Sequence, residues 1–220
     1  MRNQDKIRKL IARNQQLHSR NASLIKAIKN LKAVQKELIF LAHYDSLTQL
    51  PNRLQFIHDL QHEITRAQKQ QHHFALLKID LDFFKNVNDC FGHDVGDCLL
   101  YEVALRLRSC IRENDCIARL GGDEFAVILT EINDIHRVQF IAQQIIDTMS
   151  HPFQINTHTV SIGTSIGIAY FPEAGSESQS LYKSADIALY QVKEHGRNHH
   201  QFFTPFSSSD RIHNKLRMNT

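Results

Sequence analysis

Two short segments of the chain carry acidic side chains at positions that suit metal binding. Asp80 stands near the end of the apolar run 74–81, which is typical of a buried central strand. Asp123 and Glu124 directly follow a pair of glycines in the second segment. Magnesium prefers several oxygen ligands and is commonly held together with substrate phosphates. If they lie on neighbouring strands, these carboxylates could hold one or two ions. Two metal ions would stabilise the attacking and leaving oxygens of an in-line displacement at phosphorus.

The glycine pair, Gly121 and Gly122, lies between two runs with strand character, 116–119 and 123–129. Glycine permits positive φ angles and a close approach of backbone to a ligand, so the segment is predicted to form a tight hairpin turn. An ordinary polar hairpin turn has the same composition. The pattern alone therefore leaves a metal-binding turn and a plain turn as alternatives.

The elements that must position these residues alternate between helical and strand periodicity. Pro51 breaks the chain, and Asn52 is the predicted cap of a fresh helix. Helices and hairpins that share one sheet predict an α+β fold, a mixed α/β sandwich whose central, mostly antiparallel sheet is flanked by helices. The predicted helices are 54–64, 94–111, 135–149 and 180–194, and the predicted strands are 74–81, 116–119, 123–129, 153–155, 159–170 and 200–203.

The N-terminal segment 1–42, called the stalk below, has a seven-residue leucine repeat. Leucine fills every d position of five heptads, and isoleucine or an amide fills each a position, which predicts a coiled coil of two parallel helices. An amphipathic helix packed on its own domain is the alternative, because Ile11, Ile25 and Ile39 widen the apolar stripe. The d positions are Leu10, Leu17, Leu24, Leu31 and Leu38, and the a positions are Ile7, Asn14, Asn21, Ile28 and Gln35.

The net charge of +3 conceals an asymmetry between the stalk and the rest of the chain. Residues 1–40 hold ten Lys and Arg against two acids, so 16 of the 26 basic and 21 of the 23 acidic side chains lie beyond them. An acidic body argues against a nucleic-acid-binding core. The basic residues of the stalk are spread along the leucine repeat rather than gathered before it, unlike those of a DNA-reading zipper. We expect no nucleic-acid partner.

Membrane and secretion signals are not found in the sequence. No apolar run approaches the length of a membrane span, and no apolar segment follows the basic N-terminus as in a signal peptide. The four cysteines lack the spacing of a zinc site. These features predict a cytoplasmic chain with reduced thiols and no membrane segment.

Several motifs, all in the same order, resemble those of the GGDEF family of diguanylate cyclases. The resemblance covers about residues 43–203 and implies the nucleotide-cyclase or palm-like fold of that family. It rests on Asp45-x-Leu-Thr-x-Leu-Pro-Asn-Arg53, Asp80-Leu-Asp-Phe-Phe-Lys85, Asn88-Asp89-x-Phe-Gly-His-Asp94, Gly96-Asp97, Arg119-Leu-Gly-Gly-Asp-Glu-Phe125 and Lys193-x-x-x-Arg197-Asn198.

The resemblance implies a set of catalytic and metal-binding residues. Asp80 and the carbonyl of Leu81 would bind metal with Asp123, and Glu124 would complete the metal shell. Asp123 is implied as the proton acceptor from the attacking 3′-hydroxyl, with Lys85 as a further catalytic residue. Two Mg²⁺ or Mn²⁺ ions per active site are the implied cofactors.

The resemblance also implies how GTP is recognised. Asn88 and Asp97 would read the guanine edge with His93 nearby, because a misfit base would leave buried polar groups unpaired. The turn at Gly121 and Gly122 would lie against the nucleotide.

Basic residues are implied as contacts of the triphosphate, namely Lys85, Lys193 and Arg197. Lys193 and Arg197 are four residues apart and are expected to share one face of a helix. A basic last turn that complements the helix dipole is the alternative for these two residues.

In the implied reaction, two GTP molecules are joined into cyclic di-GMP. Each 3′-oxygen attacks the α-phosphate of the other nucleotide, so two catalytic domains must face each other across a two-fold axis. A parallel coiled coil would supply a homodimer at high effective concentration. The predicted stalk and the implied chemistry therefore require the same assembly.

Arg112 and Asp115 precede the glycine turn at the spacing of the family's inhibitory product site. The resemblance implies that cyclic di-GMP binds there and holds the domains apart. An ion pair between these two residues at a helix end is the alternative. Relatives can have a second arginine at the position of Gln144. The glutamine in its place is expected to reduce the affinity for the product.

The tail after residue 204 resembles the linker to a following EAL phosphodiesterase domain. We therefore divide the chain into a dimerisation helix (1–42), a GGDEF catalytic domain (43–204) and a linker (205–220), with an upstream sensor and a downstream EAL domain as expected partners. The alternative function is that of a non-catalytic GTP-binding module that regulates a neighbouring domain.

Overall fold

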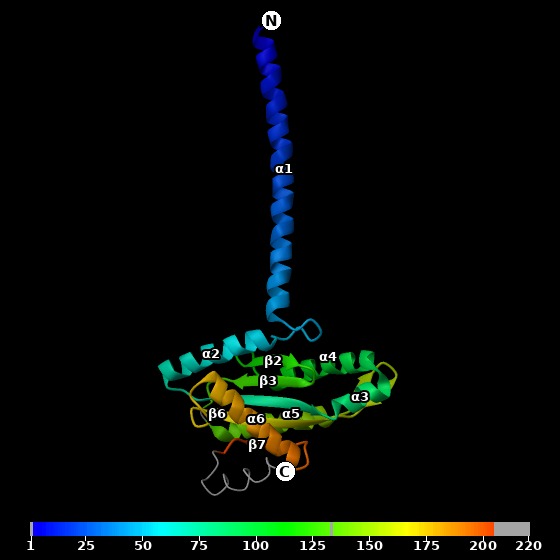
Figure 1. The fold of residues 1–220 in the computed structure, drawn as a ribbon, viewed down its shortest axis with the longest axis vertical. Helices are drawn as coiled ribbons and strands as arrows, with labels where there is room; N and C mark the ends of the chain where they lie inside the picture. The colour runs from blue at the N-terminus through cyan, green and yellow to red at the C-terminus, as the bar shows by residue number, and fades with distance from the viewer. Residues whose placement is uncertain (1, 133, 205–220) are drawn as a thin grey trace, which may run out of the picture. The chain divides into compact units, whose positions relative to one another are not determined.

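A computed structural model describes residues 2–132 and 134–204 of the chain (Figure 1). By its internal contacts the chain divides into two units, Met1–Ala42, the stalk, and His43–Thr220, called the body below. Within the described residues, no helix combines the length and the apolar character needed to cross a membrane. The predicted linker over 205–220 lies outside the described residues.

The stalk is one long helix, as the leucine repeat predicts. α1 (Arg2–His43) runs without a break through all five heptads. The leucines at its d positions are 49–69% exposed in the single chain. Apolar side chains in such a continuous row are ordinarily covered by a partner surface. The parallel dimer is still a prediction.

The body is built on a five-stranded sheet in the order β2-β3-β1-β6-β7. The central strand β1 (Phe74–Asp82) runs antiparallel to both of its neighbours, β3 (Glu124–Leu129) and β6 (Gly163–Phe171). At the edges, β2 (Cys116–Gly121) pairs antiparallel with β3, and β7 (His200–Phe202) pairs parallel with β6. The predicted central, mostly antiparallel sheet is confirmed.

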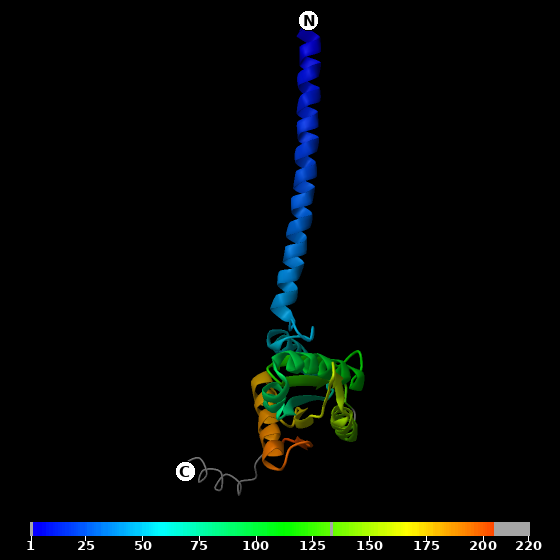
Figure 2. The same cartoon turned by 90° about the vertical axis from the view of Figure 1, so that its right-hand side faces the viewer.

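Helices cover both faces of this sheet. α2 (Arg53–Gln70) and α6 (Ser178–Glu194) pack on one face, and α4 (His93–Cys110) and α5 (Ile135–Ser150) pack on the other. The orange α6 and the yellow-green α5 lie on opposite sides of the body in Figure 2. The short helix α3 (Phe84–Phe91) packs against α4. The predicted α+β sandwich is confirmed.

Strand β1 divides its side chains between the two faces. Its odd-numbered residues, 75–81, join the core under α4 and α5, and its first even-numbered residues join the core under α2 and α6. Because successive side chains of a strand point to opposite faces, Lys78, Asp80 and Asp82 lie on the α2 and α6 face. The strand therefore changes from apolar to polar along that face.

Two details of the predicted secondary structure are wrong. The expected strand 159–170 is divided: β5 (His158–Val160) pairs with β4 (Phe153–Ile155) in a separate two-stranded sheet, and β6 starts only at Gly163. The alternation of buried and exposed side chains continues through the break, so periodicity could not reveal it. Helix α3 was not predicted, because its eight residues are too few to display a helical period.

Candidate active site

The glycine turn between β2 and β3 is held in an unusual backbone conformation. Gly121 and Gly122 have φ angles of +136° and +54°, a region that side chains rarely adopt. The Arg119 guanidinium donates to the Gly122 carbonyl at 2.8 and 3.0 Å and to both carboxylate oxygens of Asp45 at 3.0 and 3.1 Å. A Cβ atom at either glycine would meet nothing within 4 Å, so the space beside the turn is open to a ligand.

The register of β1 and β3 brings the two acidic segments side by side. Asp80 stands opposite Glu124, and the Leu81 N–H donates to the Asp123 carbonyl at 3.3 Å. The neighbouring strands that the sequence analysis required are therefore present. Carboxylate and carbonyl oxygens form a donor set that suits Mg²⁺ or Mn²⁺.

These carboxylates are not gathered around one point. Within the described residues, no three His, Cys, Asp or Glu side chains are arranged as a group that could hold a metal ion. Two of the carboxylates are instead bonded to lysines.

Asp80 is bonded to a lysine from α6. The Lys193 Nζ lies 2.7 Å from Asp80 Oδ2, and the Asp80 side chain is 10% exposed. Burial raises the pKa of the Asp80 carboxyl, Lys193 opposes the rise, and the nearby charges of Asp123 and Asp82 add to it. Lys193 therefore favours the charged form of Asp80, which burial disfavours.

Glu124 is held by two basic side chains. The Lys78 Nζ lies 3.2 Å from Glu124 Oε1, and Arg53 Nη2 lies 3.7 Å from Glu124 Oε2. Lys78 also forms an ion pair with Asp186 of α6, and its ammonium lies over the Tyr182 ring, 5.0 Å from the centroid. Burial alone would lower the pKa of Lys78, but Asp186 and Glu124 outweigh it and raise the pKa above its ordinary value.

The residues implied in guanine recognition lie on α3 and α4. The Asn88 Oδ1 atom is buried and has no hydrogen-bond partner in the structure. It lies over Gly96, where an added Cβ would come within 1.9 Å of it. His93 and Asp97 are exposed in the first two turns of α4.

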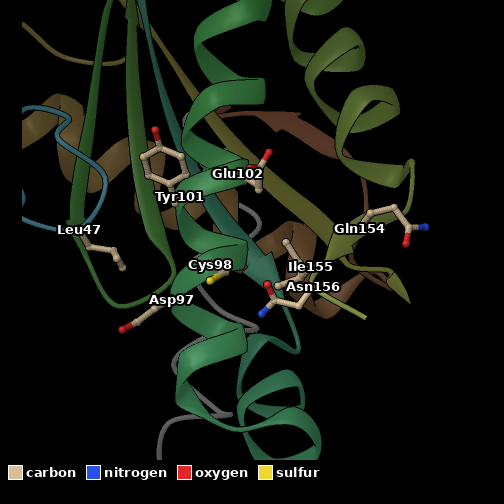
Figure 3. Close-up of a pocket in the computed structure, with 8 residues that line it drawn as sticks. All are labelled: Leu47, Asp97, Cys98, Tyr101, Glu102, Gln154, Ile155 and Asn156. Atoms are coloured by element: carbon tan, nitrogen blue, oxygen red, sulfur yellow. The ribbon is translucent and has the colours of Figure 1, made fainter. Parts of the chain in front are cut away.

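Asp97 also lines a shallow cavity of about 370 Å³ across α4. Figure 3 shows this helix with Leu47 on one side and the β4–β5 hairpin on the other. Asn88 does not line this cavity, although its Oδ1 lies over Gly96, the residue before Asp97. The lining residues are Leu47, Asp97, Cys98, Tyr101, Glu102, Gln154, Ile155 and Asn156.

The prediction that Lys193 and Arg197 share a helix face is wrong, and so is that of a basic last turn formed by both. α6 ends at Glu194, and the chain then turns through Gly196 and Arg197 with φ angles of +106° and +63°. Many helices end with a residue in the left-handed conformation. Here the Arg197 N–H donates to the Val192 carbonyl of the last turn at 3.0 Å.

Two of the three implied phosphate contacts flank the end of β1. The Arg197 guanidinium lies over the Phe83 ring, 4.9 Å from its centroid, and Phe83 directly precedes α3. Lys85 is exposed in the first turn of α3.

Arg112 and Asp115 lie in the turn between α4 and β2. The Arg112 backbone N–H donates to Asp115 Oδ2 at 3.0 Å, and the Thr130 N–H donates to Asp115 Oδ1 at 2.9 Å. This bond uses the Arg112 backbone, and within residues 2–132 and 134–204 the Arg112 guanidinium forms no ion pair or hydrogen bond. They line a cavity of about 400 Å³ with Pro51, Asp59, Arg108, Ile111, Glu113, Cys116 and Ile117.

Asp82 and Lys78 are both buried, and no role was predicted for either residue. The Asp82 carboxylate accepts from the Ser165 hydroxyl at 2.7 Å and from the Asn198 N–H at 3.0 Å, so it ties β6 and the chain after α6 to β1. The strand period of two, counted from Asp80, was the available signal for both residues.

An α+β domain with an oxygen-rich site and adjacent lysines is suited to phosphate chemistry. Residues 42–199 match the family model described as diguanylate cyclase, GGDEF domain. The chain therefore belongs to the GGDEF family.

Three known proteins illustrate the relationship. The bifunctional diguanylate cyclase/cyclic di-GMP phosphodiesterase MucR of Pseudomonas aeruginosa is 45% identical over 174 residues, which are 79% of this chain and 25% of MucR. The GGDEF domain of TpbB from the same species superposes with a TM-score of 0.72 at 40% identity, covering 74% of this chain and 95% of that structure. The coiled coil and GGDEF domain of DgcB from Caulobacter crescentus, in complex with c-di-GMP, gives 0.76 at 27% identity and covers 84% and 98%. This chain thus spans about a quarter of the length of MucR.

Proposed function

We propose that this chain is a diguanylate cyclase, which condenses two GTP molecules into cyclic di-GMP and two pyrophosphates. The observation that carries the proposal is the register of β1 with β3, which sets Asp80 opposite Glu124 and next to Asp123. Membership of the GGDEF family adds the nucleotide substrate.

The acidic residues carry the chemistry in this proposal. Asp123 accepts the proton of the 3′-hydroxyl as its oxygen bonds to the α-phosphorus of the other GTP and pyrophosphate leaves. Asp80, the Leu81 carbonyl, Asp123 and Glu124 would hold two Mg²⁺ or Mn²⁺ ions. Such ions stabilise the charge that develops on the attacking and leaving oxygens.

The remaining site residues bind and orient GTP. The buried, unpaired Oδ1 of Asn88 supports a role in base recognition, because it can accept a hydrogen bond from a guanine N–H group. Asp97 would accept from the same base edge, with His93 beside it. Lys85, Lys193 and Arg197 would hold the triphosphate at the ends of α3 and α6. The glycines at 121 and 122 would let the protein backbone of the turn approach the nucleotide closely.

The reaction also needs a second copy of the chain. We propose a homodimer through the leucine repeat of α1, which would bring two bodies together at high effective concentration. We further propose that cyclic di-GMP inhibits the enzyme through Arg112 and Asp115, whose cavity and unused Arg112 guanidinium leave room for an anionic ligand.

A second candidate function is a GTP-binding module that regulates a neighbouring domain. The observation that favours it is the similarity to NbdA of Pseudomonas aeruginosa, 35% identical over 186 residues, whose name gives a cyclic di-GMP phosphodiesterase activity and no cyclase activity. An upstream sensor and a downstream EAL domain would then be its partners.

The test is an assay of the purified chain with GTP and Mg²⁺ over a range of protein concentrations, with products separated by chromatography. A cyclase that works as a dimer forms cyclic di-GMP at a rate that rises faster than linearly with protein concentration. GTP binding without product, at concentrations where the chain is dimeric by sedimentation, would favour the regulatory module instead.

A further inference from the structure

Two carboxylates of the proposed metal site are bonded to lysines instead of to a shared cation. Lys193 lies 2.7 Å from Asp80, and Lys78 lies 3.2 Å from Glu124. Each ammonium supplies locally the positive charge that a metal ion would supply. The protein's own lysines therefore compete with metal ions for these carboxylates.

The two lysines differ in how firmly they are held. The Lys78 side chain is 7% exposed and has two carboxylate partners and an aromatic ring around it. The Lys193 side chain is 34% exposed, near the end of α6, and Asp80 is its described ion-pair partner. Because the Lys193 side chain is about one third exposed, water can solvate its ammonium when the ion pair opens, which lowers the free-energy cost of leaving the carboxylate. Lys78 is thus fixed and Lys193 is displaceable.

We propose that Lys193 is a displaceable counter-ion, which occupies the place of a metal ion at Asp80 until a nucleoside triphosphate arrives. This inference rests on the proposed function, because it takes Asp80 as a metal ligand and Lys193 as a phosphate contact. A triphosphate offers the ammonium another anion, and the released Asp80 then accepts a divalent cation. Metal and nucleotide consequently favour each other's binding, and the coupling is reciprocal.

The Lys78 ion pair explains how Lys193 can move while α6 stays in place. Asp186 and Lys193 are seven residues apart on α6, so they lie on one face, and their partners Lys78 and Asp80 are two apart on β1. One pair, Lys78 with Asp186, continues to hold the helix on the strand when the other opens. The exchange therefore needs only a change in the Lys193 side chain.

The experiment titrates Mn²⁺ into the full chain without nucleotide and follows free Mn²⁺ by electron paramagnetic resonance. Lys193→Met removes the competing cation, and we expect it to bind Mn²⁺ roughly fivefold more tightly than the wild type or better. Adding Asp80→Asn to this variant should abolish the gain. Lys183→Met, an exposed lysine on the same helix, changes the net charge equally and should leave Mn²⁺ binding unchanged.

Lys193→Gln, which keeps polarity without charge, should reproduce the gain and guards against a packing artefact of methionine. The counter-ion role would be overturned, and the metal site would stand, if two results came together. The wild type and both Lys193 variants would bind Mn²⁺ with equal affinity, and the wild type would bind it tightly once a non-hydrolysable GTP analogue is present. Absence of Mn²⁺ binding by every variant, with and without the analogue, would overturn the metal site itself and the counter-ion role with it.

Discussion

The stalk and the body use the same apolar residues in opposite ways. Leu10 and Leu31 of the stalk are 64% and 69% exposed, whereas Leu99 and Leu107 of the body are 0% exposed. The body buries its apolar side chains between its own sheet and helices, so one chain completes its fold. The stalk has a regular apolar repeat that one helix cannot bury. Its sequence is therefore adapted to a surface beyond the helix itself.

Charged side chains show the same contrast. The lysines and arginines of the stalk from Lys6 onward are exposed, whereas the body buries Lys78, Asp80 and Asp82 on one face of its central strand. Buried charges cost folding free energy even when they are paired. Their concentration on the face that carries the candidate site indicates that this part of the body is adapted to chemistry at the expense of stability.

The largest effect is expected at the acidic turn of the body. Asp123→Ala removes the proposed metal ligand and proton acceptor, and should lower the rate of cyclic di-GMP formation about 10³-fold. Because the defect lies within each body, it should be the same at every protein concentration. Product chromatography measures the rate, and Asp147→Ala, an exposed acid on α5, is the matched control with no loss. Full synthesis by Asp123→Ala would show that the site is wrongly assigned.

Next in size is the difference in stability between a leucine of the core and one of the stalk. Leu99→Ala leaves a cavity under the sheet and should cost about 3 kcal/mol of unfolding free energy. Leu31→Ala removes an exposed side chain and should change the unfolding of the body by less than about 0.5 kcal/mol. All five tyrosines lie at or beyond residue 44, and the chain has no tryptophan, so tyrosine fluorescence during urea unfolding reports on the body. A large effect of Leu31→Ala on this signal would contradict the independence of the two units.

The sequence predicted the elements whose side chains repeat regularly over many residues. The apolar run 74–81 gave β1, and the leucine repeat gave α1, because burial on fixed faces imposes a period on each. The predicted end of the last helix at residue 194 is confirmed, but Lys193 and Arg197 were still expected on one helix face. Local repetition could not predict the left-handed turn through Gly196 and Arg197 that places Arg197 beside Phe83.

The sequence predicted the acidic residues of the candidate site but not the lysines that form ion pairs with them. The family motifs named Asp80 and Glu124, but no motif pairs them with Lys193 and Lys78. The Asp80–Lys193 pair depends on the packing of α6 against β1, and the Glu124–Lys78 pair depends on the pairing of β1 with β3, so both join segments far apart in the sequence. Only the tertiary structure shows that these two carboxylates form ion pairs with lysines in the absence of a metal ion.

A somewhat smaller effect is expected from breaking the leucine repeat of the stalk. Leu17→Asp with Leu24→Asp places charges in the seam of the proposed dimer, and should lower the rate about 100-fold at low protein concentration. The rate should recover as the protein concentration rises, because each body retains its site. Ser19→Asp, at an f position on the outside of the heptad, is the control. An unchanged rate and an unchanged sedimentation coefficient in the double variant would exclude dimerisation through α1.

The smallest effect concerns the buried charge of Asp80 and is measured as a melting temperature in the presence of a chelator. Burial raises the pKa of Asp80, so ionisation of this carboxyl is less favourable in the folded chain than in an exposed aspartate. Asp80→Asn keeps the shape and removes the charge, so its melting temperature should lie modestly above that of the wild type although its synthesis of cyclic di-GMP is lost. Lys193→Met breaks the same ion pair from the other side and leaves the buried carboxylate without its cation, so it should melt below the wild type. Shifts of the melting temperature in opposite directions would mean that the carboxylate is kept for chemistry and that the lysine reduces its cost in stability. A lower melting temperature in both variants would mean that the ion pair stabilises the body. No exposed charge of the stalk is expected to stabilise its unit in this way.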